Sequence, residues 1–365
     1  MQTVAVYELW FRVFALVMGA IVGSFLNVCI YRLPRDLSVN EPRRSFCPAC
    51  QKQIPWQRNL PLISWLWLRG KCGDCGGKIA FRYFAVELLT ALLFLALWMV
   101  FPWPVALAYW VLVSLLVVAT FIDFEHFIIP DEITIGGAVA GVVASIALPA
   151  LMEESSRLRA GAWSLGSAAL GYGLLWLVLE GGKMIFGKKK IRLAEPTPFS
   201  WVRSGDDAEF IVGEERGMWS DYFARETYRM VLQCAETVID DRPFQPTTLL
   251  FHYNQLIIGE ETFVLDQVDR ISGVVRELQI PREAMGRGDL KFLAAIGAFL
   301  GWRGVLCSIF AGSLAGSLVG LVSLMLGNRA WSAKLPFGPY LALGALVWMF
   351  WGQQLLGWYV GLLSP

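Results

Sequence analysis

Two aspartates stand at the boundaries of long apolar segments. Asp123 directly follows one such segment, and Asp289 opens another. A carboxylate at such a position is costly, so it usually lies at the membrane interface or takes part in chemistry. Two carboxylates in contact share one proton: the ionised one takes a proton from water, and the protonated one binds a scissile carbonyl. The pattern therefore predicts acid–base hydrolysis of a peptide bond by Asp123 and Asp289, without a covalent intermediate.

The residues next to each aspartate suit a close approach of substrate. Glycine lets the backbone approach another chain closely. The start of a helix favours a negative charge, and a proline ends the helix that precedes it. We expect five residues to support the site: Gly286, Gly288, Lys291, Pro130 and Asp131.

Another reading of the two aspartates is that each is a helix cap or the partner of a cation at the membrane interface. Asp131, Glu125 and Glu132 also lie near Asp123, so the sequence alone does not select the catalytic partner. His126 reads as an interfacial residue rather than a catalytic base.

Four cysteines form two Cys-x-x-Cys pairs, Cys47 with Cys50 and Cys72 with Cys75. This spacing is typical of a zinc site with four thiolate ligands. Disulfides or redox-active thiols are the alternatives, and a reducing cytoplasm disfavours disulfides. Because four sulfur ligands leave no open position for water, the zinc ion would be structural.

The composition indicates a membrane protein. Hydrophobic residues make up 56% and charged residues 17% of the chain, against about 25% charged residues in an average soluble domain. Apolar runs long enough to cross a bilayer recur along the chain. We expect eight spans, with a turn at Gly301–Gly304 between the sixth and the seventh: about 8–30, 84–101, 104–122, 133–150, 162–180, 290–306, 308–327 and 337–362.

Basic residues between the predicted spans set the orientation. They concentrate in 31–82, in Lys183–Arg192 and in 328–334, which fall on one side if there are eight spans. That side should be cytoplasmic. Asp123 and Asp289 then lie at the same cytoplasmic boundary.

A polar segment interrupts the apolar pattern from about 193 to 288. It is acidic, and no lysine occurs between Lys190 and Lys291. Runs at 209–213, 248–253 and 262–265 have strand composition, and Tyr222–Ile239 could form a helix. We expect a soluble cytoplasmic α+β domain inserted between the fifth and sixth spans.

Taken together, the motifs resemble the bacterial prepilin peptidases, also called type IV leader peptidases. Outside the insert the match runs along nearly the whole chain, through Gly23-Ser-Phe-Leu-Asn27, Tyr31-Arg-Leu-Pro34, the four cysteines, Asn59-Leu-Pro61, Ser64-Trp65, Arg69-Gly-Lys71, Arg82-Tyr83, Glu87, Asp123, Ile129-Pro-Asp131, Gly286-Arg-Gly-Asp-Leu-Lys291 and Phe337-Gly-Pro339.

The resemblance implies an enzyme of the inner membrane with its site facing the cytoplasm. Its catalytic aspartates would be Asp123 and Asp289, and its substrates type IV prepilins or type II secretion pseudopilins. Many members then methylate the new N-terminus with S-adenosylmethionine. Candidate residues for that cofactor are Arg69, Lys71, Arg82 and Glu87, although membrane-surface anchoring explains them equally well. The resemblance implies no nucleic-acid partner.

The expected organisation has five parts: a first span in 1–30, a zinc loop in 31–83, spans two to five in 84–182, the insert in 183–285 and spans six to eight in 286–365. The insert departs from the family pattern. We expect it to gate the site, to attract basic prepilin leaders or to contact pilus or secretion assembly proteins, and a tolerated loop insertion is the alternative. A transporter and a non-catalytic scaffold of an export machine are the competing functions.

Overall fold

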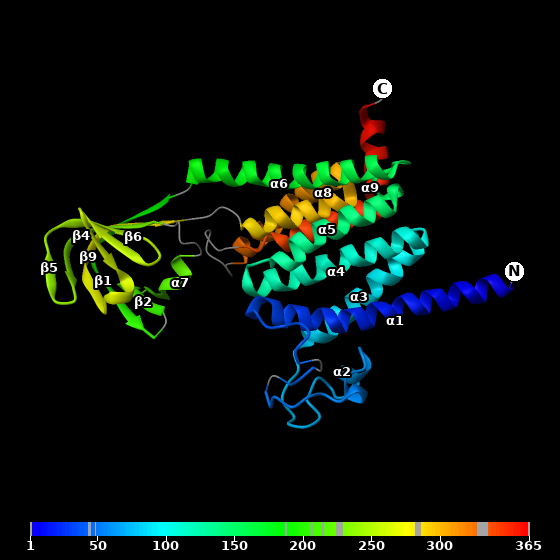
Figure 1. Ribbon diagram of the computed structural model, residues 1–365, viewed down its shortest axis with the longest axis horizontal. Coiled ribbons are helices and arrows are strands. Elements are labelled where there is room, and N and C mark those ends of the chain that lie inside the picture. The colour runs from blue at the N-terminus through cyan, green and yellow to red at the C-terminus, as the bar shows by residue number, and fades with distance from the viewer. Residues whose placement is uncertain are drawn as a thin grey trace. The chain divides into compact units, whose positions relative to one another are not determined.

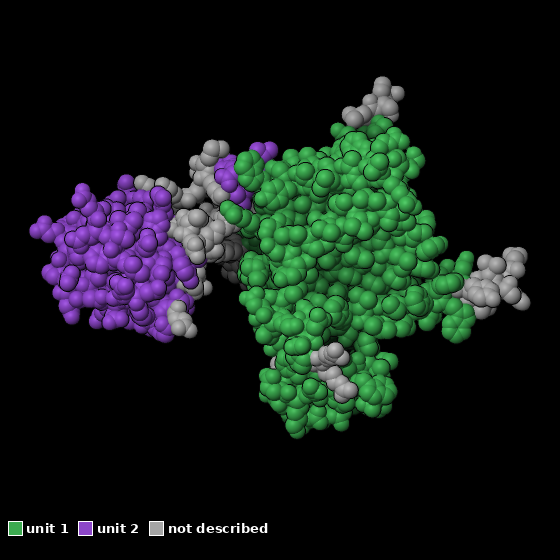
Figure 2. All heavy atoms as spheres, viewed as in Figure 1, with its two compact units in different colours: residues 1–176, 285–365 green, residues 177–284 purple. Residues whose placement is uncertain are grey.

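The computed structural model describes residues 2–42, 45–47, 49–186, 188–205, 207–213, 215–223, 229–281, 286–326 and 335–363. The chain divides into two compact units, coloured separately in Figure 2. The first unit comprises residues 1–176 and 285–365, and the second comprises residues 177–284. Each unit is described below by itself.

Long apolar helices form the first unit (Figure 1). Helix α1 packs against α3 and α4, helix α5 against α4 and α8, and helix α9 against α4 and α8. The helices are α1 (Gln2–Arg32), α3 (Phe81–Val100), α4 (Trp103–His126), α5 (Asp131–Ala147), α6 (Arg157–Phe186), α8 (Arg287–Met325) and α9 (Gly338–Leu363).

Five helical segments among the described residues are long and apolar enough to cross a membrane: Glu8–Arg35, Phe81–Val100, Trp103–His126, Arg157–Gly182 and Arg287–Met325. Helices α5 and α9 occupy two further segments that the sequence predicts as spans. The helical positions therefore agree with the predicted pattern, while the count of eight spans stays a prediction.

Helix α8 is a tight hairpin of two helices. Gly301 has φ 69° and ψ 179°, which breaks the helix at the predicted turn. A Cβ on Gly297 would lie 2.8 Å from Val305 Cγ2, so the chain folds back on itself there. The carbonyl of Ala298, one of the last four of the first helix, would lack a helical partner. It accepts hydrogen bonds from the hydroxyls of Ser145 at 3.0 Å and Ser164 at 2.7 Å.

The second unit contains one antiparallel sheet in the order β3-β2-β1-β9-β4-β6-β7-β8, with β5 paired to β4. Aromatic residues such as Trp201, Phe210, Trp219 and Phe251 fill a single core. The strands are β1 (Lys188–Ser204), β2 (Asp207–Val212), β3 (Glu215–Met218), β4 (Met230–Ile239), β5 (Arg242–Phe244), β6 (Thr247–Phe251), β7 (Gln255–Ile258), β8 (Glu261–Val264) and β9 (Arg270–Pro281).

The three predicted strand runs of this unit correspond to β2, β6 and β8, but the predicted helix at Tyr222–Ile239 was wrong. Among the described residues of that range, Tyr222 ends the short helix α7 (Trp219–Tyr222), and Met230–Ile239 is strand β4. Burial along β4 alternates because Met230, Leu232 and Cys234 point into the core. This period of two is that of a half-buried strand. The described part of the insert is therefore a β domain rather than α+β.

Candidate active site

Asp123 occupies the last turn of α4 and is buried, with 5% of its surface exposed. The helix ends beyond it because Phe127 adopts a left-handed conformation and donates its N–H to the Asp123 carbonyl. The Asp123 side chain accepts a hydrogen bond at Oδ2 from the backbone N–H of Gly338, at 2.9 Å. Thus the start of α9 holds the carboxylate at the end of α4.

Asp289 lies in the first turn of α8 and is also buried, with 7% exposed. Gly286 caps this helix in an extended conformation, and a Cβ added there would lie 3.5 Å from Asp289 Oδ2. Ile129 follows the helix that carries Asp123 and packs against Gly288, the residue before Asp289. The two carboxyl groups therefore belong to one site.

Ile129 joins the segments that carry the two aspartates. A Cβ on Gly288, beside Asp289, would lie 3.2 Å from Ile129 Cβ. A Cβ on Gly338 would lie 2.9 Å from Ile129 Cδ1 and 2.8 Å from Asp123 Oδ2. The side chain of Ile129 thus packs between the starts of α8 and α9, and both glycines are needed for this close approach.

Lys291 and Asp131 form an ion pair at the exposed edge of the site. Lys291 Nζ lies 2.6 Å and 2.8 Å from the two carboxylate oxygens of Asp131. Asp131 is the first residue of α5, directly after Pro130, which is its N-cap. The pair links the start of α5 to the first turn of α8.

The structure brings all seven predicted catalytic and supporting residues to this junction of α4, α5, α8 and α9. It also separates the candidates for the catalytic pair. Asp131 is exposed and bound to Lys291, and Glu125 is exposed and paired with Arg82, whereas Asp123 and Asp289 are buried. Glu132 is exposed, and His126 lies 4.0 Å from Glu125.

The four cysteines form a cluster in the loop before α3. Their sulfur atoms all lie within 4.8 Å of one another. Tetrahedral zinc with Zn–S bonds of about 2.3 Å needs sulfurs about 3.8 Å apart, and Cys47 Sγ lies 3.9 Å from Cys75 Sγ. Backbone N–H groups of Asp74 and Cys75 lower the pKa of the Cys72 thiol to about 7, while the neighbouring sulfur of Cys50 and burial raise the pKa of the Cys75 thiol to about 11. The donor set fits zinc.

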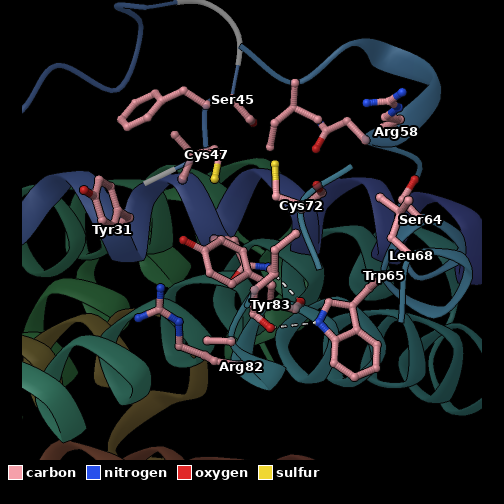
Figure 3. Close-up of a pocket in the computed structure, with 18 of the residues that line it drawn as sticks. Tyr31, Ser45, Cys47, Arg58, Ser64, Trp65, Leu68, Cys72, Arg82 and Tyr83 are labelled. Carbon is pink, nitrogen blue, oxygen red and sulfur yellow. Dashed lines mark hydrogen bonds between the residues drawn. The ribbon is translucent and has the colours of Figure 1, made fainter. Parts of the chain in front are cut away.

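A cavity of about 440 Å³ lies between this loop and the ends of α1, α3 and α4. Cys47 and Cys72 line one side, and Arg82, Tyr83 and Trp65 line the opposite side (Figure 3). The remaining walls come from α1, the loop and the end of α4: Ser24, Asn27, Val28, Tyr31, Arg32, Arg35, Ser45, Phe46, Ala49, Ile54, Arg58, Asn59, Leu60, Ser64, Leu68, Gly73, Asp74, Lys78, Ile79, Ala80, Glu87 and Glu125.

Two of the four candidate cofactor residues line this cavity. Glu87 is buried and accepts the backbone N–H of Leu62 at 2.7 Å. The guanidinium of Arg82 is paired with Glu125 and lies 5.1 Å from the centre of the Tyr83 ring. The other two, Arg69 and Lys71, are exposed and lie outside the cavity wall.

Sequence reasoning missed three residues of these sites. Gly338 and Ile129 stood in motifs that carried the family resemblance, but nothing in their types showed that they contact Asp123 or Gly288. Asn27 is buried in the cavity wall, donates to the Tyr83 carbonyl at 2.9 Å and leaves its Oδ1 without a partner among the described residues.

Comparison with known proteins agrees with this geometry. Residues 17–101 match the family described as the bacterial peptidase A24 N-terminal domain. Residues 110–194 and 262–321 match the type IV leader peptidase family. The interruption between 194 and 262 falls within the β domain. No solved structure matches the chain.

Curated relatives carry the name prepilin leader peptidase/N-methyltransferase. The relative from Aeromonas hydrophila is 30% identical over 363 residues, covering 93% of this chain and 90% of the relative. That from Pseudomonas aeruginosa is 26% identical over 98% of this chain and 96% of its own. The Myxococcus xanthus relative is 49% identical over 39% of this chain and 42% of its own.

A pair of buried carboxylates at the ends of apolar helices defines a membrane-embedded class of aspartic peptidase. The chain belongs to the type IV leader peptidase family, as the resemblance of its motifs predicts.

Proposed function

We propose that this chain is an aspartic endopeptidase of the bacterial inner membrane. It removes the leader of type IV prepilins or type II secretion pseudopilins at the cytoplasmic face. The observation that carries the proposal is the burial of Asp123 and Asp289 in one site, at the end of α4 and the start of α8. Relatives named prepilin leader peptidase/N-methyltransferase support the substrate class.

Hydrolysis uses the two carboxyl groups in different protonation states. The ionised one takes a proton from water as the water oxygen bonds to the scissile carbonyl carbon, and the protonated one donates to the carbonyl oxygen. The C–N bond then breaks, and the leaving amine takes up a proton. Gly338 fixes the Asp123 carboxylate through its N–H, and the Lys291–Asp131 pair holds the first turn of α8.

The test uses Asp123→Asn and Asp289→Asn with a purified prepilin, and mass spectrometry reads the leader. We expect neither variant to remove it, because an amide can neither take the proton nor share one. Glu132→Gln is the matched control, since its carboxylate is exposed in the first turn of α5. If both Asn variants still removed the leader, the two aspartates would not be the catalytic pair. A wild-type chain that left the leader in place would instead favour a transporter or a non-catalytic scaffold.

A second activity, N-methylation of the new N-terminus, is supported by the cavity beside the zinc loop. Its volume of about 440 Å³ falls in the usual range of small-molecule sites, about 300–1,000 Å³. S-adenosylmethionine supplies the methyl group when bound. Tyr31, Phe46 and Tyr83 give the cavity aromatic walls, with the guanidinium groups of Arg35, Arg32 and Arg82 over their rings. Glu87 adds a buried carboxylate. Mass spectrometry of a co-expressed pilin reports cleavage and methylation together.

Zinc in the four-cysteine cluster would hold one wall of this cavity, because Cys47 and Cys72 line it. The ion would have no open coordination position and no part in the chemistry. Its role would be to fold the loop between α1 and α3. The helices that the structure describes in this loop are short: η1 (Leu33–Arg35), η2 (Trp56–Arg58) and α2 (Ile63–Trp67).

The β domain would act on substrate access. Its acidic composition suits attraction of a basic leader, and contacts with pilus or secretion assembly proteins are the other use. Deleting residues 193–280 and measuring cleavage of several prepilins in detergent tests this role. Unchanged rates on all of them would mean that the domain is a tolerated insertion.

A further inference from the structure

The loop that carries the cysteines exposes a group of large apolar side chains. Trp67 is 83% exposed and Leu66 is 58% exposed. With four other exposed apolar side chains of the loop and the start of α3, they are here called the α2 patch: Trp56, Leu60, Ile63, Leu66, Trp67 and Phe81. So many exposed large apolar side chains on one short segment indicate an interaction site.

Helix α2 is drawn beside α1 and α3 rather than beyond their ends (Figure 1), and its neighbour Leu62 contacts α3. The backbone N–H of Leu62, at the start of α2, binds the carboxylate of Glu87. Glu87 lies almost two turns inside α3, about 9 Å along the axis at 1.5 Å per residue. Trp65 packs on Phe81 and Phe84 of α3, with ring centres 5.6 Å and 5.2 Å apart. These contacts hold helix α2 against the first two turns of α3.

The loop also lies alongside α1, well before the end of that helix. Ser24 and Asn27 of α1 line the cavity together with Leu60 and Trp65 of the loop. Ser24 lies about 12 Å before the end of α1, by the same rise per residue. The loop therefore runs back along both helices, and its outer face meets whatever surrounds them.

The charges and side-chain types of the loop indicate that its outer face meets lipid. Leu88 and Leu92 of α3 expose apolar surface as a bilayer-facing helix would. Tryptophan is the side chain that favours the membrane interface. Arg58 and Arg69 flank α2 along the chain, Arg58 being paired with Asp74. No acidic residue occurs between Glu41 and Asp74, so the loop suits anionic lipid headgroups.

We propose that the α2 patch is embedded in the cytoplasmic leaflet of the membrane. Leu66 and Trp67 lie among acyl chains, while Arg69 and Lys71 reach anionic phosphates. The loop is then a zinc-folded membrane anchor instead of a free cytoplasmic domain. The inference rests on the membrane placement in the proposed function, and the experiment separates the two.

The experiment uses the full wild-type chain, one copy per nanodisc, in phosphatidylethanolamine and phosphatidylglycerol at three to one. A trace lipid carries a diazirine in its acyl chain, and tryptic peptides are read by mass spectrometry after illumination. Cleavage at Arg58 and Arg69 releases peptide 59–69, which contains α2. Peptide 72–78, from the polar knuckle, is the negative control, and the long peptide beginning at Tyr83, from α3, is the positive control.

We expect label in peptide 59–69 at a level comparable with the α3 peptide and at least about tenfold above peptide 72–78. The double variant Leu66→Ser and Trp67→Ser should lose most of that label while keeping one zinc per chain. A patch reserved for a second copy or a prepilin, and held above the bilayer, would leave peptide 59–69 unlabelled and overturn the inference. Absence of label from the α3 peptide as well would instead contradict the membrane placement.

Discussion

The backbone N–H of Gly338 donates a hydrogen bond to Asp123 Oδ2 at 2.9 Å, across 215 residues of chain. The contact is buried, and it joins the start of α9 to the end of α4. A Cβ at position 338 would lie 2.8 Å from the same oxygen, so only glycine lets the amide come this near. The carboxylate of Asp123 is thus oriented by a backbone group at the start of α9.

Replacing Gly338 with alanine should slow cleavage without abolishing binding. The added Cβ would push against Asp123 Oδ2 and Ile129 Cδ1, and a displacement of about 1 Å at a catalytic group can cost about 100-fold in rate. We expect kcat for leader removal to fall by about that factor while KM changes little.

Gly136→Ala is the matched control for that experiment, because a Cβ on Gly136 of α5 meets nothing within 4 Å. It should cleave at the wild-type rate. Equal rates for Gly338→Ala and wild type would show that the carboxylate does not depend on this amide.

Exchanging the partners of the Lys291–Asp131 ion pair should distinguish positioning from catalysis. The two side chains are 33% and 60% exposed, and exposed pairs contribute about 0.2–1 kcal/mol. Asp131→Asn should therefore keep much of the cleavage rate, whereas Asp123→Asn should lose at least about 100-fold. Rates of leader removal in one detergent provide the comparison.

The double exchange Asp131→Lys with Lys291→Asp completes this experiment. If the pair only holds α5 against α8, Asp131→Lys alone and Lys291→Asp alone should each lose cleavage activity. The double exchange should recover it. A dead Asp131→Asn variant with no recovery in the exchange would make Asp131 a member of the catalytic machinery.

Local patterns in the sequence predicted that Asp123 and Asp289 lie at helix ends, and they predicted the cysteine cluster and the positions of the long helices. These features depend on residues a few positions apart, such as Cys47 with Cys50, or on the length of an apolar run. The contact of Gly338 with Asp123 and that of Leu62 with Glu87 join distant segments, so no local pattern could reveal them. The helix predicted at β4 was wrong because the buried residues Met230, Leu232 and Cys234 repeat every second position, which is the period of a strand.

Breaking the cysteine cluster should separate methylation from cleavage. Cys47→Ser removes one of four thiolates, so the purified chain should lose about one zinc ion. Because Cys47 lines the cavity and not the aspartate site, we expect methylation of a co-expressed pilin to fall well below cleavage. Metal analysis and pilin mass spectrometry measure the two effects.

The control for the cysteine experiment is Cys234→Ser, in the core of the β domain. Burial raises the pKa of the Cys234 thiol to about 11, so this group stays a neutral thiol. The variant should keep its zinc. Loss of cleavage and methylation to the same degree in Cys47→Ser would contradict a zinc role confined to the cavity.

The α8 hairpin predicts a non-additive effect of two serines on stability. Ser145 and Ser164 both donate to the carbonyl of Ala298, just before the turn at Gly301. Either single change to alanine leaves the other donor in place and should cost about 0.5–1.5 kcal/mol. The double variant leaves a buried carbonyl without either hydroxyl, so its loss of stability should exceed the sum of the single losses.

Thermal unfolding in detergent measures the three variants. Ser167→Ala is the control, because the Ser167 hydroxyl has no partner among the described residues and its removal should change stability little. Strict additivity would mean that the two hydroxyls stabilise the hairpin independently of the carbonyl they share.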